Sequence, residues 1–235
     1  MLYVNDLPKS VKNTAKLFAD DSKLYSEITD EFDCERLQND LNILSAWSKQ
    51  WLLNFNSTKC VVLKLKKSLE YVYSLGGYEL QSVSEQKDLG VTITTNLKPE
   101  THISHITKKA YQRVGLIKRC FTNLTKKKLT ILYTTNVRLL LEYASVIWNP
   151  YYVKDIEKIQ KVQDKCLSLC EENIQMDSLL VRRNKIDLVE TYKILYNKYK
   201  IDPDCLFVKA DNNLRGHSMK LQKSNVHTDV RKYFF

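Results

Sequence analysis

The hydrophobic and polar positions at the start of the chain follow a period of two. In KLFADDSKLY (Lys16 to Tyr25), apolar and polar residues alternate on both sides of Asp20 and Asp21. Alternation of this kind is typical of strands, and two such runs around a short polar tip predict a hairpin. We therefore expect the two adjacent aspartates at the tip of a β-hairpin.

The next segment changes to a helical period. In DEFDCERLQNDLNILSAWSKQWLLNF, apolar residues recur at steps of three and four, which predicts an amphipathic helix that begins at acidic residues. Three strand patterns follow: NSTKCVVLKLKK, a hairpin around Gly76 and Gly77, and KDLGVTITTNL, where Gly90 marks a bulge or a close approach. The apolar face of the helix is expected to contain Phe32, Leu37, Leu41, Leu44, Trp47, Trp51 and Leu52.

After Pro99 the pattern is helical almost throughout, to about Tyr199, and periodicity is lost from Asp202. The scarcity of Gly (5) and Pro (4) also favours helices over a turn-rich all-β fold. We predict an α+β fold in three parts. Residues 1–99 form a small antiparallel sheet with a packed helix, 100–200 a mostly helical region, and 201–235 an irregular tail.

The charge balance points to a polyanionic partner. The formal net charge is +10 and the sequence pI about 9.2, which suits nucleic acid or an anionic surface. The longest nearly apolar stretch, RLLLEYASVIW, is too short to span a membrane and contains Glu142, so we expect no membrane segment. The six cysteines are scattered and are interpreted as reduced thiols.

The acidic pair allows two interpretations. Aspartate is favoured in turns because its side chain bonds nearby backbone amides, so Asp20 and Asp21 can be simple turn residues. Alternatively, a tight turn holds carboxylate oxygens at the end of a sheet, where they suit Mg²⁺. Such a metal site needs at least one further carboxylate from another strand.

Several separate motifs occur in an order that resembles a known family. LYVNDLP, LFADDSKLY, WSKQWLLNFNSTKC, DLGVTI and HISHITKKA, with LEYASVIWNPY, IEKIQKVQDK and LRGHSMKL later, resemble the reverse transcriptase of non-LTR (LINE-type, jockey-like) retrotransposons. The resemblance covers essentially the whole chain. It implies a polymerase palm over residues 1–99 and a thumb-like region over 100–200.

The resemblance also implies roles for individual residues. Asp20 would be a Mg²⁺ ligand and Asp21 its neighbouring carboxylate, with Phe18 and Ala19 shaping the turn. Lys59 resembles the lysine near the incoming deoxynucleoside triphosphate. Leu89 and Gly90 would belong to the primer grip. The lysines expected to lie against an RNA template and DNA primer through phosphate contacts are Lys108, Lys109, Lys126, Lys127 and Lys128.

The chain departs from the family pattern upstream. The family carries its other metal-binding aspartate on an earlier palm strand, and that strand, the fingers and the endonuclease domain find no match here. We therefore expect that the chain does not polymerise alone. A non-catalytic basic nucleic-acid-binding protein and an inert retroelement remnant stay open as alternatives. The resemblance implies a place in the nucleus or cytoplasm, and the oligomeric state stays open.

Several other residues are explained by structural roles as well as by function. His102 and His105 are expected to face solvent or a phosphate at a helix start. Trp47, Trp51 and Trp148 suit either stacking on bases or anchoring of the core, and their helical spacing beside leucines favours the core. Arg182 and Arg183 suit either phosphate contacts or salt bridges.

Overall fold

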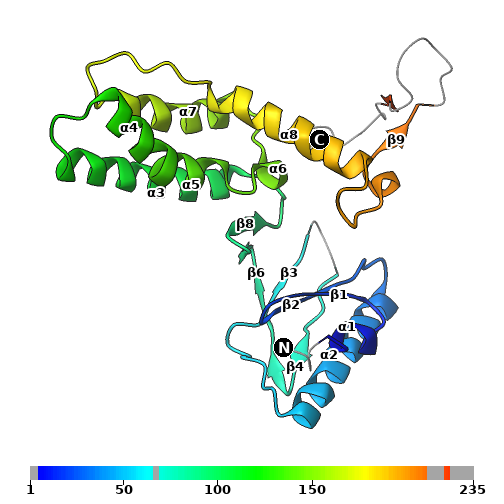
Figure 1. Cartoon of the computed structure of the whole chain (residues 1–235). Coiled ribbons are helices and arrows are strands. Elements are labelled where there is room, and N and C mark those ends of the chain that lie inside the picture. The colour runs from blue at the N-terminus through cyan, green and yellow to red at the C-terminus, as the bar shows by residue number, and fades with distance from the viewer. Residues whose placement is uncertain (1–4, 66–68, 211–219, 223–235) are drawn as a thin grey trace. The chain divides into compact units, whose positions relative to one another are not determined.

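The computed structural model describes residues 5–65, 69–210 and 220–222. Helices and strands both occur, which confirms the α+β class. The contacts divide the chain into two units, each of which is described by itself (Figure 1). The first unit covers Met1–Gln86 with Thr94–Asn96, and the second covers Lys87–Ile93 with Leu97–Phe235. The loop Lys87–Ile93 therefore packs with the second unit although it precedes Pro99.

The first unit is built around one long helix. Its core contains Leu44 and Trp47 of this helix, together with Leu7, Tyr73 and Leu80 from other segments. The elements are α1 (Leu7–Ser10), β1 (Thr14–Phe18), β2 (Asp21–Tyr25), α2 (Glu31–Trp51), β3 (Val61–Leu63), β4 (Ser74–Leu75), β5 (Tyr78–Glu79) and β6 (Gln81–Val83).

Helix α2 begins and ends at recognisable caps. The Asp30 carboxylate accepts the backbone N–H of Asp33 at 2.9 Å, and the helix ends where Leu52 takes a left-handed φ of +55°. The predicted apolar face is correct in its centre and wrong at its ends: Phe32, Trp51 and Leu52 are exposed. Phe32 lies two positions from the buried Cys34, which is about 200° around a helix, and so points away from the core.

The strands of the first unit form separate pairs. β1 pairs with β2, and β4 pairs with β5 across Gly76 and Gly77, so both predicted hairpins are confirmed. β3 pairs with β6 in parallel. The strand predicted over NSTKCVVLKLKK is shorter than expected because only Val61–Leu63 pair, and Leu65 is exposed. Lys66 lies outside the described residues.

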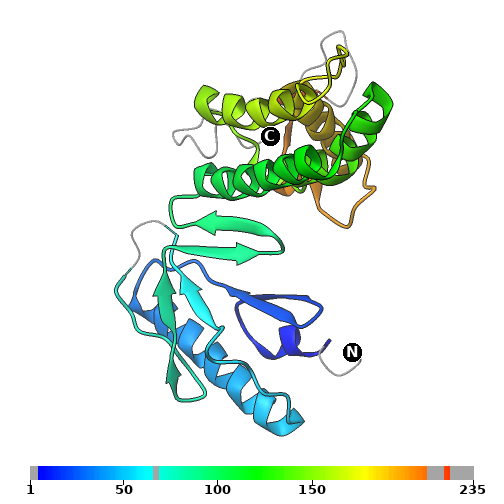
Figure 2. The same ribbon diagram turned by 90° about the vertical axis from the view of Figure 1, so that its left-hand side faces the viewer.

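The second unit is mostly helical, as predicted. Helices α3 and α7 lie side by side in both views (Figure 1, Figure 2). The last helix begins at Leu179, after the N-cap Ser178, whose hydroxyl accepts the backbone N–H of Val181. The strands β7 (Glu85–Asp88) and β8 (Val91–Thr94) belong to this unit over residues 87–93. Its other elements are α3 (Glu100–Cys120), α4 (Lys126–Leu132), the π-helix η1 (Tyr133–Arg138), α5 (Leu139–Glu142), α6 (Ser145–Trp148), α7 (Val153–Leu167) and α8 (Leu179–Leu195).

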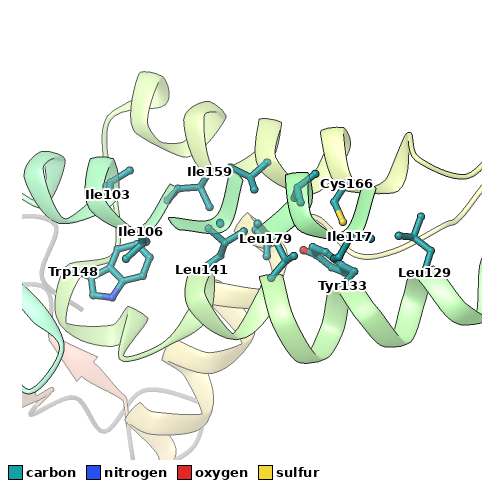
Figure 3. Packing of buried hydrophobic residues seen from close by; sticks show 14 of the residues in the cluster. Ile103, Ile106, Ile117, Leu129, Tyr133, Leu141, Trp148, Ile159, Cys166 and Leu179 are labelled. Atoms are coloured by element: carbon teal, nitrogen blue, oxygen red, sulfur yellow. The ribbon is translucent and has the colours of Figure 1, made fainter. Parts of the chain in front are cut away.

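The core of the second unit runs along α3, η1 and α7. Five apolar residues on the inner face of α3 are buried: Ile103, Ile106, Ala110, Val114 and Ile117. Figure 3 shows Tyr133 close to Ile117 at one end of this core and Trp148 beside Ile106 at the other. The buried Tyr133 hydroxyl donates to Gln163 Oε1 at 2.6 Å, which joins η1 to α7.

The described part of the tail contains a 3-10 turn, Pro203–Cys205, and a short antiparallel pair, β9 (Val208–Lys209) with β10 (Leu221–Gln222). The rest of the tail predicted as irregular, 211–219 and 223–235, lies outside the described residues. None of the described helices combines the length and apolar character needed to cross a membrane.

Candidate functional site

The acidic turn lies where the sequence predicted it. Phe18 pairs with Asp21, so Ala19 and Asp20 form the two-residue tip and Asp21 is the first residue of β2. Ala19 takes a left-handed φ of +53°, a conformation more usual for glycine. Both aspartates are exposed, and their carboxylates are therefore accessible to a ligand.

A buried carboxylate on α2 anchors the base of this hairpin. Asp40 is 1% exposed and accepts the backbone N–H groups of Lys12 at 3.0 Å and Asn13 at 2.7 Å. The Asn13 side-chain amide also donates to Asp40, at 2.9 Å, while its oxygen accepts the Ser26 hydroxyl at 3.0 Å. The two ends of the hairpin are therefore tied to α2 through one side chain.

Sequence reasoning missed Asp40, although a signal was present. Asp40 lies three residues after Leu37 and four before Leu44, so it occupies the apolar face of its helix. A charged residue on a buried face needs partners, and the residues before β1 supply them.

The two aspartates offer the type of donor that a Mg²⁺ site needs. Carboxylate oxygens are the donor type that Mg²⁺ prefers. Among the described residues, however, no group of three His, Cys, Asp or Glu side chains is positioned to hold a metal ion. The two carboxylates are therefore of the type that binds Mg²⁺, but the described residues do not supply a complete set of ligands.

Lys59 lies in the first unit, as the acidic turn does. Its backbone N–H donates to the Asn56 carbonyl at 3.0 Å in the turn that leads into β3, and its side chain is exposed. The structure leaves the Lys59 ammonium accessible, which is the condition for the proposed triphosphate contact.

Leu89 and Gly90 lie in the second unit and form the two-residue turn between β7 and β8. Both have left-handed φ values, +44° and +90°, as a type I′ turn requires. Gly90 is therefore a turn residue, and the predicted bulge is wrong. The predicted close approach is correct, because a Cβ at Gly90 would lie 3.0 Å from Cε1 of Tyr143.

His102 corrects the expectation that both histidines face outward. It is 2% exposed, and its Nδ1 accepts the backbone N–H of Thr92 in β8 at 3.1 Å. Its ring centroid lies 5.0 Å from that of Trp148. Burial, with the nearby positive charges of His105 and Lys109, lowers the pKa of His102 to about 4. His102 is therefore a neutral acceptor that joins the hairpin to α3, whereas His105 is exposed.

The predicted nucleic-acid lysines lie on two helices of the second unit. Lys108 and Lys109 are exposed on α3, and the lysines at 126–128 are exposed in the first turn of α4. Thr125 is the N-cap of α4, although its side chain makes no capping hydrogen bond. Cations at a helix start oppose the helix dipole, so helix stability does not explain this cluster.

The surrounding sequence is uniformly basic. From Thr101 to Leu141 the chain contains no Asp or Glu. All of the five cations on α3 are exposed. The nine cations of the stretch are Lys108, Lys109, Arg113, Lys118, Arg119, Lys126, Lys127, Lys128 and Arg138.

The two arginines of α8 have structural roles. Arg182 forms a double hydrogen bond with Glu142 at the end of α5, which raises the pKa of the guanidinium. Arg183 is fully buried, and its Nε donates to Asn149 Oδ1 at 3.1 Å. Of the two explanations that the sequence left open, the salt bridge holds for Arg182, and Arg183 is inaccessible to a phosphate.

Comparison with known proteins identifies a similar protein, a polymerase of a transposon. No protein-family model and no solved structure matches the chain. The chain is 29% identical over 159 residues to a Drosophila melanogaster protein named "Probable RNA-directed DNA polymerase from transposon BS". The match covers 64% of this chain and 17% of that polymerase, so the chain spans a small part of its relative. This similarity supports a relationship to the reverse transcriptases of transposable elements.

Proposed function

We propose that this chain is a palm and thumb section of the RNA-directed DNA polymerase of a non-LTR retrotransposon, and that it binds an RNA template paired with a DNA primer. The observation that carries the proposal is the acid-free stretch Thr101–Leu141, in which the eight cations on α3 and α4 are all exposed. Phosphates are the polyanion that such a surface suits, and the similarity to a transposon polymerase favours a template and primer.

In this proposal Asp20 and Asp21 contribute to a Mg²⁺ site, and Lys59 lies near the incoming deoxynucleoside triphosphate. Paired Mg²⁺ ions, when bound in such sites, favour attack by a hydroxyl and departure of pyrophosphate. The hairpin holds the two carboxylates at its exposed tip, and Asp40 fixes the base of the hairpin on α2. Because the described ligand set is incomplete, we propose that the chain alone does not extend a primer.

Primer extension with Mg²⁺ and deoxynucleoside triphosphates tests the catalytic part. The chain is expected to incorporate no nucleotide. Incorporation that disappears in Asp20→Ala would contradict the proposed inactivity and establish a complete site. Asp20 is exposed, so this variant is expected to fold like the wild type and serves as a clean control.

Binding tests the nucleic-acid part. We expect a labelled RNA–DNA hybrid to bind the wild type and to bind the triple variant Lys126→Ala, Lys127→Ala, Lys128→Ala more weakly. A matched control removes three exposed lysines outside the acid-free stretch: Lys161, Lys198 and Lys200. Binding without extension is the result that the proposal expects, and it also fits the non-catalytic alternative. Absence of binding would refute the proposal, and the inert retroelement remnant would be the remaining interpretation.

A further inference from the structure

The turn between β7 and β8 is strained and open on its outer side. Leu89 has a φ of +44° although it carries a side chain, and that side chain is 41% exposed. A left-handed conformation is disfavoured for residues other than glycine, asparagine and aspartate. The two-residue hairpin turn requires this conformation, so contacts that hold the turn in place must offset its cost.

One side chain from a distant segment contacts both residues of the turn. The Tyr143 hydroxyl donates to the Leu89 carbonyl oxygen at 2.9 Å, across 54 positions of sequence. The same ring covers Gly90 so closely that a Cβ would lie 3.0 Å from Cε1. Tyr143 therefore contacts both residues of the turn, one through its hydroxyl and the other through its ring.

Tyr143 is itself held by the second unit. Its backbone N–H donates to the Leu139 carbonyl at 3.1 Å, at the end of α5. Its carbonyl accepts the indole N–H of Trp148 at 2.8 Å, and Trp148 is 4% exposed. The turn is thus connected through Tyr143 to a buried part of the core.

The strand that follows the turn is fixed as well. Val91 is buried, and the Thr92 N–H donates to His102. These anchors hold the inner side of the hairpin and leave the Lys87 and Leu89 side chains exposed on the outer side. A pinned turn with an exposed apolar tip and a neighbouring cation is suited to contact a sugar–phosphate backbone.

We infer that Tyr143 is a positioning residue, which holds the Leu89–Gly90 turn in one conformation and thereby presents Leu89 to the primer strand near its 3′ end. This inference rests on the proposed binding of template and primer. The inference adds Tyr143, a residue outside the DLGV motif. It also gives a physical reason for the glycine in that motif, because the Tyr143 ring leaves no room for a Cβ at Gly90.

The first experiment tests the positioning without nucleic acid. Hydrogen–deuterium exchange of the peptide covering residues 85–94 is expected to be about threefold to tenfold faster in Tyr143→Phe, which keeps the ring and loses the hydroxyl. Tyr143→Ala should be faster still. The control Tyr78→Phe removes a hydroxyl from an exposed tyrosine of β5 and should leave this peptide unchanged. Unchanged exchange in both Tyr143 variants would overturn the inference.

The second experiment tests the primer contact. A DNA primer with 2-aminopurine at its 3′ end, annealed to an RNA template, reports the environment of that nucleotide. Tyr143→Phe is expected to bind this duplex within about twofold of the wild type, because the lysines dominate affinity. The fluorescence change on binding should fall by at least about half.

The outcomes separate the two proposals. A wild-type fluorescence change that persists in Tyr143→Phe and Tyr143→Ala would overturn the primer contact while leaving the proposed function intact. A wild type that binds no duplex would refute the proposed function and the primer contact together. The exchange experiment would still decide the positioning role of Tyr143.

Discussion

At the scale of single residues, comparing two glycines distinguishes the cost of backbone strain from the cost of a side-chain clash. Gly77 and Gly90 have almost the same φ, +89° and +90°, but of the two only Gly90 has a neighbour within 4 Å of the position that a Cβ would occupy, namely Tyr143. We expect Gly77→Ala to lower the free energy of unfolding by about 1–2 kcal/mol through strain alone. Gly90→Ala should cost about 1 kcal/mol more, because the Tyr143 ring must also move.

Urea denaturation of both variants checks this prediction. The double variant Gly90→Ala with Tyr143→Ala removes the steric conflict, so its Gly90→Ala increment should fall to the value measured for Gly77→Ala. Equal costs for the two single variants would show that Tyr143 does not constrain the turn.

His102 predicts a pH dependence of stability. Its pKa is about 4 in the folded protein, because burial and the positive charges of His105 and Lys109 disfavour the protonated ring, against about 6.5 when unfolded. Between these values the unfolded chain binds more protons. His102 therefore contributes full stability above about pH 6.5, and that contribution is lost as the pH falls toward 4. The difference corresponds to at most about 3 kcal/mol.

Denaturation at several pH values measures this slope. His102→Asn keeps an acceptor near the Thr92 N–H but does not titrate, so its stability should depend less on pH between 4 and 6.5. His105→Asn, at an exposed position, removes one of the positive charges that lower the pKa of His102, so it should reduce the slope by less than His102→Asn does. A wild-type slope in His102→Asn would show that the ring is not held neutral.

At the scale of elements, Asp40 determines how the acidic hairpin is held on α2. Asp40→Ala leaves the backbone N–H groups of Lys12 and Asn13 without their acceptor and should lower the free energy of unfolding by about 3 kcal/mol. Asp40→Asn should cost less, since one oxygen remains. Glu35→Ala, an exposed acid on the same helix, should change stability by less than about 0.5 kcal/mol. Thermal unfolding of the three variants distinguishes these expectations.

The elements themselves were largely predictable from the sequence, because their signals are local. The period of two around Asp20, the glycine pair at 76–77 and the helical face of α3 each act within one segment. The side chains that connect segments were not predictable. His102 accepts from Thr92, and Tyr143 covers Gly90, through contacts that no local period encodes.

The residues of the candidate site also divide into those that the sequence predicted and those that it did not. The tip of the acidic hairpin followed from alternation, and the exposure of Lys108 and Lys109 followed from their place outside the apolar stripe of α3. The anchors Asp40 and Tyr143 were missed because a buried acid and an exposed tyrosine gain meaning only from partners 27 and 54 positions away.

At the scale of the whole molecule, the charge distribution predicts how binding depends on salt. The nine cations between Thr101 and Leu141 have no acidic residue among them in the sequence. Each phosphate contact displaces condensed counterions and adds about 0.9 to the negative slope of log K against log salt concentration. The triple variant Lys126→Ala, Lys127→Ala, Lys128→Ala should therefore reduce that slope by about 2.7 if all three contact phosphates.

The control variant at Lys161, Lys198 and Lys200 loses the same net charge from positions outside this stretch. A general effect of net charge would change both slopes alike, whereas direct phosphate contacts would change only the first. Fluorescence anisotropy with an RNA–DNA hybrid at several potassium chloride concentrations measures both. Equal slopes in the two triple variants would exclude the first turn of α4 as a phosphate-contacting surface, and the nucleic-acid proposal would then depend on the cations of α3 alone.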